Sequence, residues 1–216
     1  MMYTSARSVS RRRRGLLAAA AAVGAAVLLA ACGGGTESGM DHGGTATPTG
    51  TASAGVPAAG THNDADVAFA QQMIPHHRQA VEMAAMADGR AGDARVTALA
   101  GQIRAAQQPE IDTMTGWLTA WGAPAPSAGD TMGDMHHDAM PGGMSESDMT
   151  ALHNAKGAEF DKQFLTMMIE HHEGAVEMAR TETAQGADPQ AKALAQKIIT
   201  AQQAEIATMK GILAQL

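Results

Sequence analysis

The chain has 216 residues, of which 45% are hydrophobic, enough to form a hydrophobic core. Only 3% are aromatic, which disfavours a large β-sandwich or barrel. The net charge is −7, and five of the 15 basic residues but none of the 22 acidic ones lie in residues 1–31. The remainder is strongly acidic, which argues against nucleic-acid binding, and the single Cys excludes a disulfide framework or a Cys-cluster metal site.

The N-terminus predicts export. Four consecutive arginines, residues 11–14, precede an apolar run from Leu16 to Ala31 that is shorter than the roughly 20 residues of a membrane-spanning helix. We therefore predict a signal peptide over 1–31. The run ends in Leu-Ala-Ala-Cys at 29–32, which resembles a bacterial lipobox, so we expect lipidation at Cys32 and a place on the extracytoplasmic face of the cell membrane. An ordinary signal with a chance Cys is the alternative.

The export route stays open, because the arginines and the following Gly-Leu-Leu also resemble a twin-arginine signal. Residues 32–62 are rich in Gly, Thr, Ala, Ser and Pro and show no hydrophobic periodicity. Such a composition predicts a flexible tether between the lipid anchor and a folded domain over residues 63–216.

The rest of the chain is one unit written twice. At an offset of 95, residues 66–119 align with 161–214 without a gap, and 25 of these 54 positions are identical. Met-Ile-Pro-His-His at 73–77 matches Met-Ile-Glu-His-His at 168–172. Two copies are too few for a solenoid, so duplication of a helical hairpin is the simpler account.

Apolar residues in each copy recur at helical spacing. We predict four helices of about 20–28 residues and an all-α four-helix bundle built from two hairpins. Asn63 or Asp64 is expected to cap the first helix, while Pro75 implies that this helix begins near Ile74 or bends there. Asp188-Pro189 predicts the start of the last helix. The link between the hairpins, residues 122–148, is long and rich in Met and His.

The first candidate metal site lies on the predicted apolar stripes, near one end of the bundle. Hairpin geometry brings Gln107 level with Met73 and puts Glu110 about one turn further out. Imidazole, carboxylate and thioether ligands together suit copper, or iron or zinc without the thioethers. The alternative is structural: methionines fill a core, and buried His and Glu stabilise one another. The core candidates are Met73, His76, His77, Glu110, Met114, Met168, His171, His172, Glu205 and Met209.

The second candidate site lies in the inter-hairpin link. Methionines in so polar a stretch have no evident core to fill, and thioethers select Cu(I) while imidazoles also accept Cu(II). A biased linker or a Met-rich surface for a hydrophobic partner are the alternatives. The loop candidates are Met132, Met135, His136, His137, Met140 and Met144.

The di-iron pattern of ferritin-like bundles needs two Glu-x-x-His motifs, and neither copy contains one. Met73 stands three residues before His76, and Ile169 stands three before His172. Oxidase or hydrolase activity therefore has little support, and we do not expect an enzyme.

The stretch from Phe69 to Ala84, followed by Glu-Ile-Asp-Thr-Met-Thr-Gly-Trp-Leu at 110–118, resembles the bacterial domain-of-unknown-function family 305. The second copy departs from the family pattern at Glu170, where the first has Pro, and at Ile212, where it has Trp. The resemblance covers residues 62–216. It implies an exported, ferritin-like four-helix bundle, and some members are implicated in periplasmic copper binding and copper resistance.

These observations together predict a lipid-anchored protein that binds copper outside the cytoplasmic membrane and sequesters it or hands it to a copper-handling partner. The loop would capture the ion and the core set would hold it, with Glu110 and Glu205 as ligands or as partners that orient the imidazoles. A di-metal oxidoreductase and a metal-free envelope module that binds a partner through its acidic surface remain the alternatives.

Overall fold

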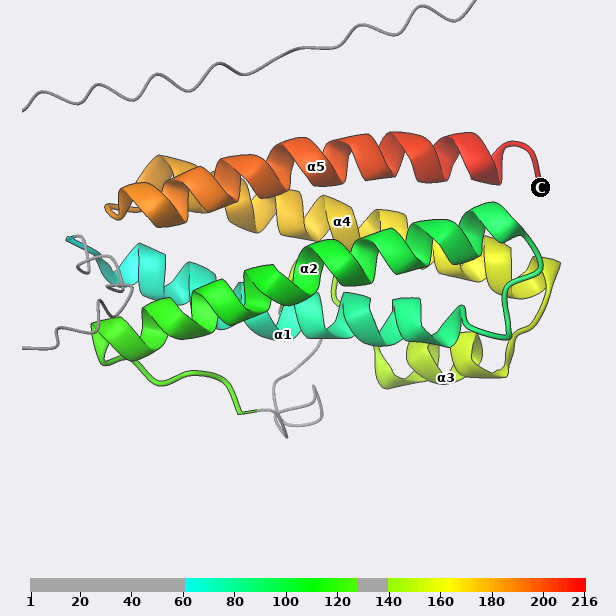
Figure 1. Cartoon of the computed structure of the whole chain (residues 1–216), viewed down its shortest axis with the longest axis horizontal. Coiled ribbons are helices and arrows are strands. Elements are labelled where there is room, and N and C mark those ends of the chain that lie inside the picture. Colours follow the sequence, from blue (N-terminus) through cyan, green and yellow to red (C-terminus); the bar gives the residue numbers. More distant parts are fainter. Residues whose placement is uncertain (1–60, 128–139) are drawn as a thin grey trace, which may run out of the picture. The chain divides into compact units, whose positions relative to one another are not determined.

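The computed structural model describes residues 61–127 and 140–216, which contain five α-helices and no strand (Figure 1). The predicted all-α class is thereby confirmed. The predicted signal peptide, Cys32 and the tether up to residue 60 lie outside the described residues. Within the described ranges no helix has the length and apolarity to cross a membrane. The helices are α1 (Asp64–Met86), α2 (Ala94–Trp121), α3 (Glu146–Asn154), α4 (Ala158–Gln185) and α5 (Pro189–Leu213).

Local sequence sets the ends of the long helices. Asn63 caps α1 in a capping box with Asp66, and the Asp188 side chain accepts hydrogen bonds from the first turn of α5. α2 ends at Gly122, whose φ of 67° is the left-handed conformation that glycine adopts without strain. α1 runs through Pro75 without a break, so a start near Ile74 is wrong. The cap at Asn63 and the burial of Pro75 in the core outweigh the missing backbone donor.

The long helices form two antiparallel hairpins, α1 with α2 and α4 with α5, as the repeat predicts (Figure 1). α1 also packs along α4, and the two run in opposite directions, whereas α2 meets α5 at few positions. The contact between hairpins is therefore made mainly by the first helix of each copy.

A pair of repeated aspartates fastens each hairpin to the turn of the other. The Asp66 carboxylate on α1 accepts hydrogen bonds from the backbone N–H groups of Ala187 and Asp188, in the turn between α4 and α5. Its counterpart Asp161 on α4 accepts from Gly92 and Asp93, in the turn between α1 and α2. Each acid satisfies buried donors at the start of a helix, a favourable place for negative charge.

The hydrophobic core is divided into two clusters along the bundle. One contains Met83, Phe164 and Met209, toward the C-terminal end of α1. The other contains Phe69, Met114 and Ile198, toward the N-terminal end of α1. Polar residues of the same stripes lie between these clusters along the helices.

The inter-hairpin link contains an unexpected helix. α3 begins at Glu146, where Ser145 and Asp148 form a capping box, and it contacts α1 and α4. Before α3, residues 141–144 follow the helices of the bundle, and the Met144 side chain is buried in the first cluster. The expectation that the link methionines have no core to fill is therefore wrong for Met144, because the link folds back onto the bundle.

Candidate metal centre

A layer of buried polar side chains crosses the middle of the bundle. We call it the histidine layer, and every member has its repeat counterpart 95 residues away. The expectation that this set lies near one end is wrong, because the dipeptides fall halfway along α1 and α4. Its members are His76 and His77 on α1, Gln107 on α2, His171 and His172 on α4, and Gln202 on α5.

Each copy pairs an imidazole with a carboxylate. His77 Nε2 lies 3.0 Å from Glu110 Oε2, and His172 Nε2 lies 2.7 Å from Glu205 Oε2. Glu110 is therefore not a turn further out than the histidines. Side chains lean toward the N-terminus of their own helix, so in antiparallel α1 and α2 the two groups lean toward one another.

The other two histidines differ between the copies. Their rings pack against each other, with centroids 3.6 Å apart and planes inclined by 37°. His76 Nε2 lies 3.1 Å from the carbonyl oxygen of Pro141, whereas neither ring nitrogen of His171 has a hydrogen-bond partner among the described residues. A carbonyl oxygen only accepts, so Nε2 of His76 carries the proton and Nδ1 presents its lone pair.

Burial favours the neutral form of three of these imidazoles. Burial and the neighbouring His77 together lower the pKa of His76 to about 3. Burial also lowers the pKa of His77, against the opposing effect of Glu110, and lowers that of His171 well below its ordinary range. Neutral imidazoles are the form that ligates metal ions.

The histidine layer has an unusual number of unpartnered atoms. Within residues 61–127 and 140–216, the following side-chain atoms are buried without a hydrogen bond: Nδ1 of all four histidines, both polar atoms of Gln107 and Oε1 of Gln202. Such orphans call for an explanation, and an ion or an enclosed water is the ordinary one. The donor set fits copper in its residue types. In the part of the chain that the structure describes, however, no three side chains of His, Cys, Asp or Glu are placed to hold one metal ion.

The core methionines lie on both sides of this layer. Met73 and Met114 belong to the cluster toward the N-terminal end of α1, and Met168 and Met209 belong to the opposite one. All four are fully buried. The duplication therefore does not bring the four thioethers together. The Met73 and Met114 pair lies on one side of the histidine layer, and the Met168 and Met209 pair lies on the other.

The structure separates the loop candidates. Met132, Met135, His136 and His137 lie outside the described residues. Met140 is half-buried and Met144 is 4% exposed, with its backbone N–H and C=O both bonded to the side chain of Gln79. Sequence reasoning missed Gln79. A signal was present, since it is a polar residue at a stripe-flanking position where the second copy has Gly174.

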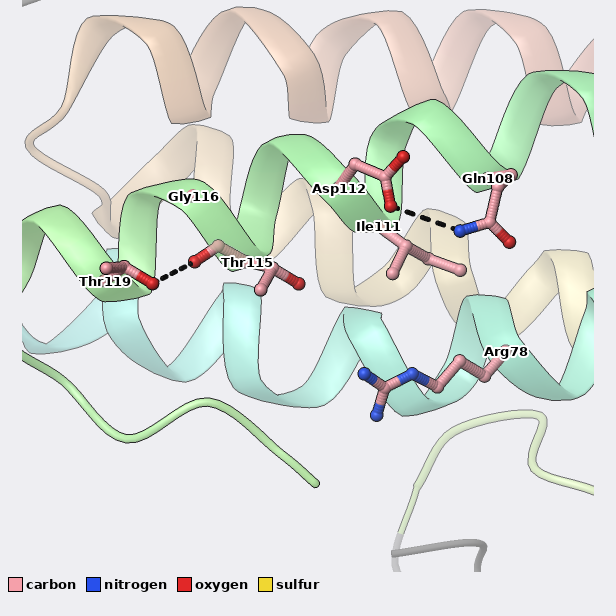
Figure 2. A pocket seen from close by; sticks show the side chains of 7 residues that line it. All are labelled: Arg78, Gln108, Ile111, Asp112, Thr115, Gly116 and Thr119. Atoms are coloured by element: carbon pink, nitrogen blue, oxygen red, sulfur yellow. Dashed lines mark hydrogen bonds between the residues drawn. The ribbon is translucent and has the colours of Figure 1, made fainter. Parts of the chain in front are cut away.

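A surface groove lies apart from this layer. It has a volume of about 560 Å³ and runs beside α2, with Arg78 contributed by α1 (Figure 2). It contains no His, Met or Cys, and Arg78 donates hydrogen bonds to the carbonyl oxygens of Pro126 and Ser127. Arg78 therefore holds the start of the inter-hairpin link. The groove is lined by Arg78, Gln108, Ile111, Asp112, Thr115, Gly116 and Thr119.

Comparison with solved structures gives relatives of the same fold. A DUF305 protein from Streptomyces coelicolor, described as secreted, is 34% identical with a TM-score of 0.63 and covers 70% of this chain and 93% of its own. A DUF305 fragment from Deinococcus radiodurans is 33% identical with a TM-score of 0.64, over 71% and 98% of the two chains.

The description of a third relative names a bound metal ion. CopM in the Cu(II)-bound form is 34% identical with a TM-score of 0.61, over 69% of this chain and 96% of its own, and further CopM structures are Cu(I)-bound or Ag-bound. The comparison with curated proteins found no match. The family model described as a domain of unknown function, DUF305, matches residues 66–213, and with the structural relatives it shows that this chain belongs to the DUF305 family.

Proposed function

We propose that this protein binds copper ions outside the cytoplasm and sequesters them or hands them on, without catalytic turnover. The observation that carries the proposal is the histidine layer, in which four buried imidazoles have an unpartnered Nδ1 atom. Copper is the cargo of this site, and the residues that hold it come equally from the two copies.

The chemistry of the layer suits an ion. Acceptors on Nε2 of His76, His77 and His172 leave Nδ1 as the free ring atom. A carboxylate on the remote nitrogen of a ligating imidazole fixes its orientation and raises its basicity, a role that fits Glu110 and Glu205 better than direct ligation.

Binding also requires rearrangement. Because no three of these groups converge as they stand, an ion needs rotation of the rings, or two imidazoles together with another donor. The buried thioethers of Met73, Met114, Met168 and Met209 flank the layer and are soft ligands that favour Cu(I).

Relatives support the choice of metal. CopM, which is 31–34% identical to this chain in its Cu(II)-bound and Cu(I)-bound forms, shares the fold over 96% of its own length. The donor types of the histidine layer agree with such a cargo. Silver-bound CopM adds a second soft monovalent ion to this comparison.

We assign capture to the Met/His-rich link, with Met132, Met135, His136, His137 and Met140 as the candidate ligands. Pro141 follows His137 by four residues, so the chain allows at most about 14 Å between them. Pro141 in turn contacts His76. Met144 would have to leave the core before it could contribute its sulfur.

We also assign an export signal to residues 1–31 and a lipid anchor to Cys32. The description of the Streptomyces coelicolor relative as secreted agrees with export. Growth with labelled palmitate, followed by comparison of the native chain with Cys32→Ala, tests the anchor: label on the native chain alone is expected, and equal label on both contradicts it.

The decisive experiment titrates the chain from residue 33 onward with Cu(I) and Cu(II) against competing chelators. A core variant carries His76→Ala with His171→Ala, and a link variant has residues 128–139 replaced by Gly and Ser in equal number. This replacement spares residues 141–144, which pack on the bundle. His153→Ala is the matched control, because His153 is exposed and its ring lies against Arg90 rather than in the histidine layer.

We expect tight Cu(I) binding by the native chain and by His153→Ala, with a loss of at least about tenfold in affinity in the core variant. Affinity retained by the core variant but lost in the link variant would move the site to the link. Absence of binding by the native chain would overturn the copper assignment in favour of a metal-free partner-binding module.

A further inference from the structure

One segment of the link lies against the outside of α1 and α4 at the level of the histidine layer. We call residues 141–144 the strap. Its first carbonyl oxygen, that of Pro141, meets His76 Nε2 at 3.1 Å. At its other end, Gln79 Nε2 donates to Met144 O at 2.8 Å and Met144 N donates to Gln79 Oε1 at 2.9 Å. The two hydrogen bonds between Gln79 and Met144 form a clamp on α1. This clamp holds the strap next to the His76 imidazole.

The strap also lies tightly against α4. A methyl group at Gly174 would overlap the Pro141 carbonyl oxygen, and one at Gly142 would come within 3.1 Å of His171 Cα. Gly142 has a φ of 70°, which favours glycine independently of the space. The backbone of the strap is thus seated between α1 and α4 at the level of the histidine layer.

Gln79 and Gly174 occupy the same position in the two repeats, 95 residues apart. The copies are identical at the five positions that follow, so this difference stands next to a well-matched stretch. In the first copy the residue grips the strap, and in the second its lack of a side chain makes room for it. The link occurs once in the chain, so only one copy can receive it.

The contact has a chemical consequence for His76 alone. Glu110 and Glu205 contact Nε2 of His77 and His172 in the same way. His171 has no acceptor on either ring nitrogen among the described residues. The Pro141 carbonyl holds the proton of His76 on Nε2, whereas nothing in the described residues fixes the tautomer of His171, whose ring packs against that of His76.

We propose that the strap is a positioning element that fixes His76 in the Nε2–H tautomer and so leaves the buried Nδ1 as the unprotonated ring nitrogen, and that Gln79 and Gly174 are the residues that seat the strap. His171 remains the adaptable member of the pair. The part of this proposal that concerns a bound ion rests on the copper-binding function proposed above, whereas the tautomer and its dependence on the strap do not.

The test reads the tautomer directly. Imidazole ¹⁵N–¹H correlation spectra are recorded on the metal-free chain from residue 33 onward, with His76 assigned by its loss in His76→Gln. Gly174→Ala places a methyl on the Pro141 carbonyl, and Gln79→Ala removes the clamp. Gly101→Ala is the matched control, since Gly101 lies in α2 with nothing near the added methyl. If circular dichroism shows that Gly174→Ala does not fold, the tautomer of His76 in Gln79→Ala decides the test.

We expect the native chain and Gly101→Ala to show His76 protonated on Nε2 alone, and the two strap variants to show a mixture of tautomers. A single Nε2–H tautomer in folded strap variants, or an Nδ1–H tautomer in the native chain, would overturn the proposal.

Cu(I) titration of the same proteins separates the two proposals. A loss of about tenfold or more in affinity is expected in the strap variants. Unchanged affinity alongside a disturbed tautomer would refute the role of His76 Nδ1 in ligation. If the native chain binds no copper, the proposed function fails, and the spectra still decide whether the strap sets the tautomer.

Discussion

Single residues set the chemistry of this bundle through what each buried polar atom contacts. Glu110 Oε2 is engaged by His77, and its other oxygen lies 3.4 Å from the exposed Lys197 ammonium. Glu205 repeats the first of these contacts with His172. Both carboxylates therefore contact Nε2 of an imidazole.

Glu110→Gln and Glu205→Gln test this role. An amide can still accept from Nε2–H but carries no charge, so it polarises the imidazole less. We expect a fall of about 10–100-fold in copper affinity with little change in helical content. Competition titration measures the affinity, and Glu177→Gln, an exposed site on α4, serves as the control. Affinity that is unchanged in both variants would contradict an orienting role.

Glu182 is a buried acid that the second repeat alone possesses, since the first has Ala87 at this position. Burial raises the pKa of Glu182 to about 8, the neighbouring Asp66 and Asp188 carboxylates add to the rise, and Lys192 opposes it. The folded protein therefore keeps this carboxyl protonated at neutral pH, while the unfolded chain loses the proton near pH 4.5.

Between these two values the folded state binds more protons at Glu182, so the contribution of Glu182 to the free energy of unfolding falls as pH rises from about 4.5 to about 8. Glu182→Gln removes this dependence and should gain at least about 1 kcal/mol relative to the native chain across the window. Urea unfolding at several pH values measures it. A native chain and a Glu182→Gln variant with parallel pH profiles would contradict the assignment, and Glu177→Gln should follow the native profile.

Helices and turns are held by contacts that cross between the repeats. Asp66 and Asp161 each bind the turn of the opposite hairpin, and Gly157 N donates to Arg90 O at 2.7 Å beside the second of these contacts. The hairpins thereby fasten one another at both ends of the bundle, in addition to the packing of α1 on α4.

Removal of one of these acids should destabilise the protein without unfolding it. Asp161→Ala leaves the N–H groups of Gly92 and Asp93 without their acceptor, and hydrogen bonds to a charged group are worth about 1.5–3 kcal/mol. We expect a loss of that size in the free energy of unfolding from urea titration. Glu159→Gln, at an exposed site in the same first turn of α4, should cost much less. Equal losses in both variants would assign the effect to the helix dipole alone.

At the largest scale, residues 61–127 and 140–216 form a bundle with a polar layer between two hydrophobic clusters. Burial lowers the pKa of His76 to about 3 and also lowers those of His77 and His171. These histidines therefore bind protons near pH 6.5 in the unfolded chain but not in the folded protein. The contribution of these three histidines to the free energy of unfolding is complete above this pH and is lost progressively as pH falls toward 3.

In a Glu182→Gln background, which removes the opposite pH dependence of Glu182, metal-free protein should accordingly unfold at lower urea as pH falls from 6.5 to 4.5. A variant with His76→Gln and His171→Gln should lose less stability over the same interval, because two protonation sites are gone. His153→Gln should behave as the native chain does, since His153 is exposed. Urea midpoints that fall equally in all three proteins would show that the acid sensitivity arises outside the histidine layer.

The sequence by itself determined much of this protein. Helical periodicity, the caps at Asn63 and Asp188, and the 95-residue repeat are local or comparative properties, and they led to the all-α fold, the two hairpins and the family. The same periodicity put the paired histidines and Glu110 on the inner stripe, because a residue's face on a helix follows from its spacing alone.

Only the tertiary structure decided how these elements meet. The contact of Asp66 with Asp188, the clamp of Gln79 on Met144 and the contact of His76 with Pro141 join residues 65 or more positions apart. Periodicity carries no information on the path of a loop, so the burial of Met144 and the strap could not be foreseen. The position of the histidine layer at mid-bundle and its link to the strap follow from how the chain returns between two nearly identical hairpins.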